Sequence, residues 1–341
     1  MKAGITDGKG RLWLEDLPLP EPGEYQCLCK NLVCATCTGT DKKIIQNALF
    51  EGMQYPGILG HESVGVVVET GRKVRNIHKG DIMIRPTAVY PQTTFAGFHS
   101  LWGAYAEYGL VTDTAALLQD HPETVLNYYC QYQMKLPADL GLDPGDAVML
   151  ITLKEVLGYA DSIGVRLNMP VMLTGVGSVG LTFCHALRLL GAYPVIVAAR
   201  RPSDFELALK LGADYVINTS TQDLKETVME ITKGHGVDRI IDATGNVEYV
   251  KQSLPALSEN GRLSPYATYP SEVVLTDWIP QEKILEGVTG EVRTHDFICS
   301  AVRHGQLNLA DLYSHRLPFE DLEKGFELIR RKEAFKIVFD F

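Results

Sequence analysis

The chain has 341 residues, of which 45% are hydrophobic and 22% are charged, a composition typical of a globular protein with room for two domains. A formal net charge of −10 argues against nucleic acid as a partner, because binding to a phosphate backbone needs basic surface. No apolar run approaches the roughly 18 residues that span a bilayer, and the N-terminus lacks a signal-peptide core. Seven cysteines, four of them between Cys27 and Cys37, fit reduced thiols better than a disulfide framework. We expect a cytoplasmic protein with no membrane partner.

The N-terminal half of the chain is predicted to be rich in strands. Residues 24–36 show a mostly alternating apolar pattern, and residues 63–69 form a second, valine-rich run. Later segments are predicted as a short helical excursion within 112–133, a β segment at 135–137, a helix at 146–163, a strand near 317–320, a helix at 322–330 and a closing strand at 335–341. The tail is expected to return and complete the first domain.

A glycine motif follows the apolar run at residues 171–174. Gly175, Gly177 and Gly180 have the spacing G-x-G-x-x-G, and residues 181–190 then follow a helical apolar rhythm. Strand, tight turn and helix form the context that a dinucleotide fingerprint requires. The glycines permit the turn and a close approach of pyrophosphate, and the helix N-terminus, which includes Ser178 and Val179, offers amide donors.

The residues after this motif strengthen the interpretation. Strands are predicted at 194–199, 213–217 and 237–242, with a helix at 204–212, and the last strand leads into Thr244 and Gly245. Repeated alternation of strand and helix predicts a doubly wound parallel sheet. The alternative is a glycine-rich turn in another kind of α/β protein.

Several short segments form one ordered set along nearly the whole chain: Gly60-His61-Glu62 with the valines and Glu69-x-Gly71 behind it, Gly80-Asp81, Gly103 with Ala106-Glu107-Tyr108, the glycine motif, Leu211-Gly212-Ala213-Asp214, Gly236-Val237-Asp238 through Gly245, and Lys336-Ile337-Val338. Together they resemble the medium-chain zinc-dependent alcohol dehydrogenases. The similarity is greatest to the polyol and sugar branch, which includes sorbitol, threonine and glucose dehydrogenases.

The resemblance implies an α/β fold in two parts. A GroES-like, β-rich catalytic domain would comprise residues 1–153 and 301–341, and a Rossmann domain would comprise residues 154–300. It further implies a small-molecule alcohol or carbonyl substrate, and we expect a homodimer or homotetramer.

The resemblance also implies a catalytic zinc, which takes three protein ligands and leaves one position open. His61 and Glu62 match the family pattern directly; a lone histidine at a strand start would otherwise be an ordinary buried residue. The cysteine is displaced, because Cys37-Thr38-Gly39-Thr40-Asp41 has one residue more than the family's Cys-Gly-Thr-Asp. Cys37 is the favoured ligand, and the alternative is that Thr38 fills the position and weakens the site.

Two further residues have family-implied roles with open alternatives. Glu155 lies four residues beyond the family's metal-site glutamate and is either an outer partner of the metal or a solvated helix residue. Thr40 stands where relatives relay the proton through a hydroxyl, and it could also cap a helix. No Cys-x-x-Cys spacing occurs from Arg85 to Cys130, so no structural zinc is expected.

The cofactor preference follows from the end of the second Rossmann strand. Relatives that bind NAD place an acidic residue there, whereas alignment puts Ala199 in that position, followed by Arg200 and Arg201. Guanidinium groups fork onto phosphate, so we predict a preference for NADP. The alternative is an ordinary exposed arginine pair.

The predicted function is that of an NADP-preferring, zinc-dependent dehydrogenase acting on a sugar, polyol or cyclitol. Zinc would act as a Lewis acid on the substrate oxygen, and the nicotinamide would exchange hydride. The alternatives are a zinc-free reductase of the quinone or enoyl type and a non-catalytic sensor of NADPH. His99, Trp102, Tyr128 and Tyr129 either line a sugar pocket or serve packing.

Overall fold

The computed structural model describes residues 1–270 and 272–341, which group into two compact units. The first unit comprises Met1–Ile151 and Cys299–Phe341, and the second comprises Thr152–Ile298. The sequence-based boundaries lie two residues further along the chain at each junction. In the described part of the chain, no helix has both the length and the apolar character needed to cross a membrane.

The main sheet of the first unit is built around the long strand β3 (Gln26–Ala35), and its strand order is β10-β6-β5-β3-β17-β16. One side of β3 pairs with β5; the other pairs with β9 along its first half and with β17 along its second half. Consecutive residues of β3 are buried on both faces of the sheet, Cys27 to Cys29 and Val33 to Ala35, so the mostly alternating pattern predicted for it is wrong. The other strands of this sheet are β5 (Ser63–Thr70), β6 (Ile82–Ile84), β9 (Tyr108–Thr112), β10 (Lys135–Leu136), β16 (His315–Pro318) and β17 (Ile337–Asp340).

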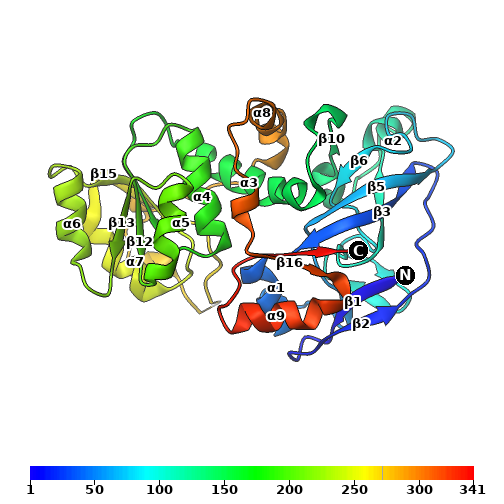
Figure 1. Cartoon of the computed structure of the whole chain (residues 1–341), viewed down its shortest axis with the longest axis horizontal. Coiled ribbons are helices and arrows are strands. Elements are labelled where there is room, and N and C mark those ends of the chain that lie inside the picture. The colour runs from blue at the N-terminus through cyan, green and yellow to red at the C-terminus, as the bar shows by residue number, and fades with distance from the viewer. Residues whose placement is uncertain (271) are drawn as a thin grey trace. The chain divides into compact units, whose positions relative to one another are not determined.

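A second sheet of the first unit has the order β2-β1-β4-β8-β7. Figure 1 shows β1 and β2 near α9, whose apolar residues Leu322 and Ile329 are buried in the same core as Leu12 of β2. The elements are β1 (Lys2–Thr6), β2 (Leu12–Asp16), β4 (Gly57–Ile58), β7 (Thr94–Phe95), β8 (Phe98–Ser100), α1 (Thr38–Ile45), α2 (Thr114–Asp120) and α9 (Leu322–Arg330).

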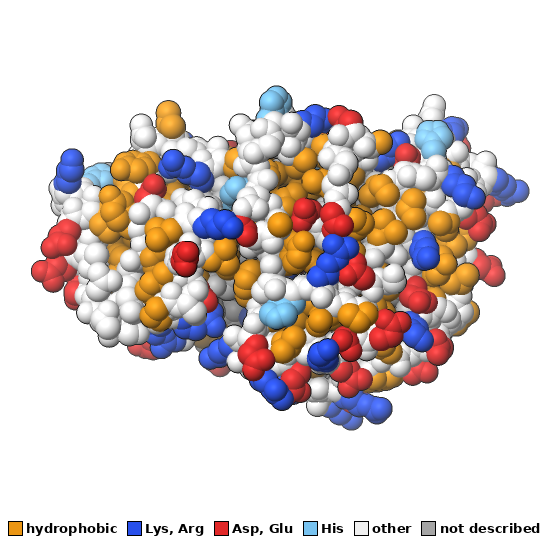
Figure 2. Space-filling view, viewed as in Figure 1, with side chains coloured by type: hydrophobic (Ala, Val, Ile, Leu, Met, Phe, Trp, Pro, Cys, Tyr) orange, Lys and Arg blue, Asp and Glu red, His pale blue; other side chains and the backbone are white. Residues whose placement is uncertain are grey.

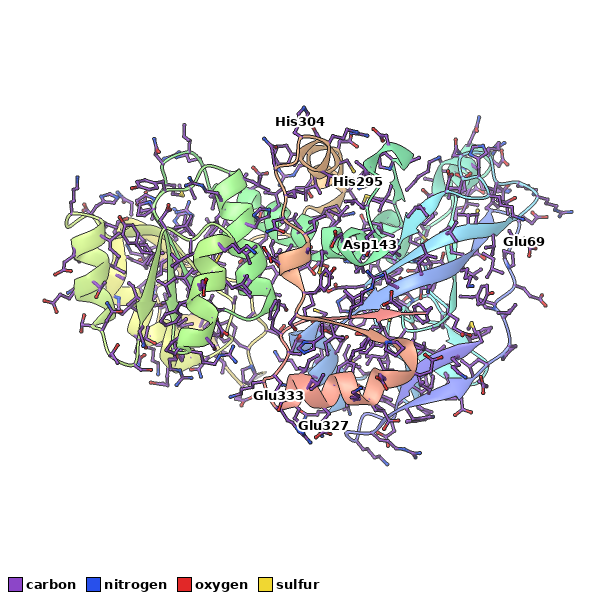
Figure 3. All side chains as sticks on the ribbon, in the orientation of Figure 1. Glu69, Asp143, His295, His304, Glu327 and Glu333 are labelled. Carbon is purple, nitrogen blue, oxygen red and sulfur yellow. The ribbon has the colours of Figure 1, made fainter. Side chains whose placement is uncertain are left out.

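The C-terminal tail belongs to the first unit, as predicted. Phe339 of β17 lies opposite Cys34 of β3. Arg316 of β16 donates to both carboxylate oxygens of Asp340, at 2.8 and 2.9 Å, and to Asp143 at 2.6 Å. Asp143, labelled in Figure 3, directly precedes α3 (Pro144–Ser162), so this guanidinium ties the tail to the start of that helix.

The second unit is a parallel sheet with the order β13-β12-β11-β14-β15, which confirms the predicted doubly wound Rossmann fold. In Figure 1, α4 and α5 lie along one face of this sheet and α6 and α7 along the other. Its strands are β11 (Val171–Thr174), β12 (Val195–Ala199), β13 (Tyr215–Asn218), β14 (Val237–Asp242) and β15 (Leu257–Pro265). Its helices are α4 (Ser178–Leu189), α5 (Phe205–Lys210), α6 (Leu224–Ile231) and α7 (Val247–Ser253); α8 (Glu291–Arg303) leads back to the first unit.

Charged side chains of both signs are interspersed on the face shown in Figure 2. Many are paired locally. Glu327, labelled in Figure 3, accepts from Arg330 at 2.6 Å and from Arg331 at 2.7 Å within and just beyond α9. Such exposed pairs each contribute only about 0–1 kcal/mol to the free energy of unfolding, so they add little to the stability of the fold.

Candidate active site

The first unit brings three potential metal ligands together. The ligand atoms of Cys37, His61 and Glu62 all lie within 4.8 Å of one another. The turn before the last two is fixed by Gly60, whose φ of +96° favours glycine and whose Cα approaches the Tyr105 ring so closely that a Cβ would clash. This turn directs His61 and Glu62 inward just before β5 begins.

The extra residue in the Cys37 segment has a clear structural outcome. Cys37 is the N-cap of α1, and its thiol points to the group of ligand atoms. Thr38 instead donates its hydroxyl to the Phe335 carbonyl oxygen at 2.7 Å. Thr40 lies inside the first turn of the helix, so the alternative that it serves as the N-cap is wrong.

A buried carboxylate lies beside both the cysteine and the histidine. Asp41 accepts from the Cys37 backbone N–H at 2.8 Å and from the Tyr105 hydroxyl at 2.6 Å, both at Oδ2. Its Oδ1 lies 3.9 Å from Nδ1 of His61, and neither atom has a hydrogen-bond partner among the described residues. Burial raises the pKa of Asp41 to about 7. Asp41 had no predicted role, although its position one helical turn after the cysteine is a usable signal in the sequence.

Glu62 has a buried cationic partner that the sequence analysis missed. Lys336 Nζ lies 2.6 Å from Glu62 Oε2, and both side chains are 1% exposed. A carboxylate at such depth requires a compensating charge. Lys336 belongs to the final strand motif, and nothing local in the sequence connects it to a residue 274 positions away.

His61 lies in surroundings that favour its neutral form. Burial, together with the positive charges of Arg85 and Lys336, holds the pKa of His61 well below its usual value. The Arg85 guanidinium donates to the His61 carbonyl oxygen at 2.8 Å. The Trp102 ring lies 5.5 Å from the imidazole, and its Nε1 donates to the Tyr128 hydroxyl at 3.1 Å.

The other polar and aromatic candidates differ in position. Tyr129 is 1% exposed and its hydroxyl lies 3.4 Å from the His61 carbonyl oxygen, a packing position. His99 is half-buried in β8. Trp102, which is partly buried, lies next to the imidazole, and the exposed Tyr128 contacts Trp102 through its hydroxyl.

The donor set fits a zinc ion. A thiol, a neutral imidazole and a carboxylate are all zinc ligands, and three protein ligands are typical of a catalytic site. The remaining cysteines suit this role poorly: burial raises the pKa of Cys27 to about 12 and the pKa of Cys34 well above its usual value. Glu155 lies on α3 in the second unit, outside the group of three ligands, and its part as an outer partner stays a prediction.

The glycine motif of the second unit forms the predicted turn between β11 and α4. A Cβ on Gly180 would lie 2.1 Å from the Gly175 carbonyl oxygen, so helix and turn touch there, whereas a Cβ on Gly177 would meet nothing within 4 Å. Gly177 is the N-cap of α4 and supplies no side-chain acceptor. The N–H groups of the first turn, which includes Ser178 and Val179, therefore face an open approach suited to phosphate.

A second missed carboxylate organises this turn. Asp242, fully buried at the end of β14, accepts from the hydroxyls of Thr174 and Thr244 at 2.6 Å each, from the Gly245 N–H at 2.9 Å and from the Tyr269 hydroxyl. It thereby fixes Thr244, whose methyl group packs against Gly175. An acidic residue that ends a buried strand just before Thr-Gly was the available signal.

β12 ends in a buried alanine, and two exposed arginines follow it. Ala199 is 3% exposed. The Arg200 guanidinium lies 4.5 Å from the centroid of the Tyr249 ring, and Arg201 Nη2 lies 2.8 Å from Asp204 Oδ2.

Comparisons with known proteins agree with this division. Residues 23–120 match the model of the alcohol dehydrogenase GroES-like domain, and residues 178–301 match that of the zinc-binding dehydrogenase domain. The L-threonine 3-dehydrogenase of Pyrococcus horikoshii is 31% identical, over 96% of this chain and 94% of that protein. An alcohol dehydrogenase of Cupriavidus necator is 26% identical, over 96% and 94%.

Solved structures share the fold. The alcohol dehydrogenase TADH from Thermus sp. ATN1 matches with a TM-score of 0.80 and 23% identity, over 100% of this chain and 99% of that chain. A zinc-binding dehydrogenase from Sinorhizobium meliloti, bound to NADP, matches with a TM-score of 0.81 and 23% identity over the same shares.

Fold and site together define a two-domain oxidoreductase with a GroES-like catalytic part and a Rossmann part. The chain belongs to the medium-chain, zinc-type alcohol dehydrogenase family. Membership supports alcohol oxidoreduction on a small-molecule substrate, with zinc and a nicotinamide cofactor.

Proposed function

We propose that this protein is a zinc-dependent, NADP-preferring dehydrogenase that interconverts a sugar, polyol or cyclitol and its ketone or aldehyde. The observation that carries the proposal is the Cys37, His61 and Glu62 group, which lies in the unit that matches the alcohol dehydrogenase GroES-like domain. We further propose a single zinc per subunit and a homodimer or homotetramer, to be checked by elemental analysis and light scattering.

Cys37, His61 and Glu62 would hold the zinc, with Glu155 as an outer partner. When bound, zinc supplies Lewis-acid polarisation of the substrate oxygen and lowers the pKa of the hydroxyl. Asp41 holds the Cys37 backbone and places its second carboxylate oxygen 3.9 Å from His61 Nδ1, and Lys336 balances the charge of Glu62. These residues hold the site in place before any substrate enters.

Thr40 is proposed to relay the substrate proton through its hydroxyl. It is half-buried in the first turn of α1, three residues after Cys37. Trp102 and Tyr128 are proposed to contact the apolar C–H face of the substrate beside His61. An aromatic face with a polar tip suits a polyhydroxylated molecule, which has both kinds of surface.

Cofactor binding is proposed for Gly175, Gly177, Ser178, Val179 and Gly180 at the pyrophosphate. Ala199, Arg200, Arg201 and Thr244 are proposed to lie along the adenosine and ribose part. The preference for NADP is supported by the missing acid at Ala199 and by the two arginines after it.

A second candidate substrate is L-threonine. Relatives named L-threonine 3-dehydrogenase match over nearly the full length at 30–31% identity, which favours this substrate over simple alcohols. L-Threonine is also a small secondary alcohol, so the same chemistry at the hydroxyl would apply to it.

The test is a turnover screen with NADP⁺ and NAD⁺ against sorbitol, xylitol, glucose, myo-inositol, L-threonine and simple alcohols. It uses protein as purified, protein treated with chelator, and protein with zinc added back. The proposal expects turnover of a polyol, sugar or cyclitol that chelation removes and zinc restores, with NADP⁺ preferred. Zinc-independent reduction of quinones or enoyl compounds would instead favour a reductase, and NADPH binding with no turnover a sensor.

A further inference from the structure

Three arginines lie at the amino edge of the parallel sheet of the second unit. Arg239 of β14 is paired in register with Val171, the first residue of β11, on one side and with Arg262 of β15 on the other. Side chains at paired positions of neighbouring parallel strands project from the same face of the sheet, about 5 Å apart. Arg166 lies at the same edge, because it belongs to the loop between α3 and β11. We call these three residues the arginine cluster.

Arg239 is half-buried and is held by two backbone carbonyl oxygens. Its Nε donates to Ile163 at 2.9 Å, and its Nη1 donates to Asp238 at 2.7 Å. Its Nη2 faces Gly164, where a Cβ would lie 3.8 Å from that nitrogen and would meet no other atom within 4 Å. The guanidinium is therefore oriented before any ligand arrives, and it is open on the side of Nη2.

The positive charges of the cluster have no carboxylate beside them. Within residues 1–270 and 272–341, no carboxylate oxygen lies within 4 Å of a guanidinium nitrogen of Arg166, Arg239 or Arg262. Burial lowers the pKa of Arg239, and the charges of Arg262 and Arg166 lower it further, against the opposite effect of Asp238. Because an arginine stays protonated in a protein, the three like charges repel one another in the absence of a ligand.

The carboxylates on the neighbouring segments are engaged elsewhere. Asp161, near the end of α3, pairs with Arg293 at 2.6 Å. Asp238 accepts from the Ser258 hydroxyl at 2.7 Å and lies 3.1 Å from Nε2 of His235. An anion that reaches the cluster would therefore not displace an ion pair of any of its three arginines.

We propose that the arginine cluster is a binding site for a phosphate dianion, either inorganic phosphate or the phosphate group of a small ester. Guanidinium groups fork onto phosphate oxygens, and a dianion offers enough acceptor oxygens and charge for three of them. The site is separate from the dinucleotide turn, because the four residues of β11, about 13 Å of extended chain, lie between the two edges of the sheet. It goes beyond the proposed dehydrogenase function and does not depend on it.

The experiment is a titration of the full chain with inorganic phosphate at pH 8, where phosphate is a dianion, followed by the width of the ³¹P NMR line. Sodium chloride holds the ionic strength constant. Arg166→Gln and Arg262→Gln should each raise the dissociation constant about tenfold, because each removes one charge-assisted bond. In the described part of the chain neither side chain donates a hydrogen bond, so both variants should fold, and either one suffices for the test.

The matched control is Arg188→Gln. Arg188 lies on α4 of the same unit and pairs with Asp214 at 3.6 Å, so its loss changes the net charge equally but leaves the cluster intact. It should change the dissociation constant by less than about twofold. An equal loss of affinity in the control would overturn the inference, because attraction by net charge would then explain the binding.

Further arms identify the ligand and the place where it binds. Acetate, a monoanion, should bind more weakly than phosphate, and equal affinity would overturn the assignment to a dianion. Glycerol 3-phosphate that binds as tightly as inorganic phosphate, or more tightly, supports a site for phosphate esters, whereas weaker binding supports a site for the free ion. Phosphate affinity that falls in Gly177→Ala but survives in Arg166→Gln and Arg262→Gln would place the anion at the dinucleotide turn and overturn the inference. No arm uses turnover or zinc, so failure of the dehydrogenase proposal would leave these results unchanged.

Discussion

The metal-ligand group of the first unit is assembled from side chains far apart in sequence, whereas the dinucleotide turn of the second unit is mostly the backbone of one continuous stretch. Lys336 pairs with Glu62, and Asp41 lies beside both Cys37 and His61. The turn depends on the absence of side chains at Gly175 and Gly180. Substitutions that leave a buried charge without its partner should therefore do most damage to the first site. Substitutions that add a side chain at a glycine should do most damage to the second.

The largest effect is expected for Lys336→Met. It removes the ammonium that lies 2.6 Å from the buried Glu62 carboxylate, and breaking a buried ion pair in this way costs about 3–5 kcal/mol. Urea unfolding of chelator-treated protein measures the loss. The double variant Lys336→Met/Glu62→Gln removes both charges and should regain much of it. A single variant as stable as the wild type would show that Glu62 does not depend on Lys336.

Gly180→Ala tests the dinucleotide turn of the second unit. Its Cβ would lie 2.1 Å from the Gly175 carbonyl oxygen, so we expect a loss of about 2–3 kcal/mol through overpacking. The matched variant is Gly177→Ala, which has open space and should cost no more than about 1 kcal/mol as an altered N-cap. Gly177→Ala should nevertheless weaken binding of ADP, measured by titration. Equal stability of the two variants would contradict the conclusion that the turn requires the close approach of Gly180 to the Gly175 carbonyl oxygen.

The same difference decides what the sequence could predict. The turn and the doubly wound sheet were predictable, because strand, glycines and helix are adjacent and each carries its own pattern. The His61-Glu62 pair was found because it too is contiguous. Lys336 and Tyr105 were missed because their partners come from segments far away in sequence, whereas Asp41 was missed although its partner Cys37 is local. β3 was predicted to alternate because the residues that pack on its two faces come from remote segments.

Tyr105→Phe probes the Asp41 connection with a smaller change. It removes one hydroxyl donor from a buried carboxylate that keeps the Cys37 N–H, so we expect a loss of about 1–2 kcal/mol. It should also weaken zinc binding in competition with a chelator, because Asp41 is then less firmly held. Tyr313→Phe is the matched control: its hydroxyl meets Asp146 at 3.2 Å in a more exposed place, and its loss should be smaller. A larger loss for the control would contradict this reading of Asp41.

The smallest effect concerns a histidine of the second unit that resembles His61 in burial but has no ligand partners. Burial lowers the pKa of His185 on α4 below its usual 6.5, and its Nε2 has no hydrogen-bond partner among the described residues. The unfolded chain therefore binds a proton near pH 6.5 that the folded protein does not yet bind. Stability from this group is complete above pH 6.5 and declines as the pH falls toward the folded value.

His185→Gln should consequently flatten the acid side of the stability profile. Between pH 7 and pH 5 the wild type should lose more stability than the variant, with a difference in slope of at most about 1.4 kcal/mol per pH unit. Unfolding in urea at pH 8, 7, 6 and 5, with chelator present, measures it, and the pH 8 values give the cost of the substitution itself. His61 titrates in both proteins and cancels from the difference. Parallel profiles would mean that His185 is protonated equally in the folded and unfolded states, and that its burial has no electrostatic consequence.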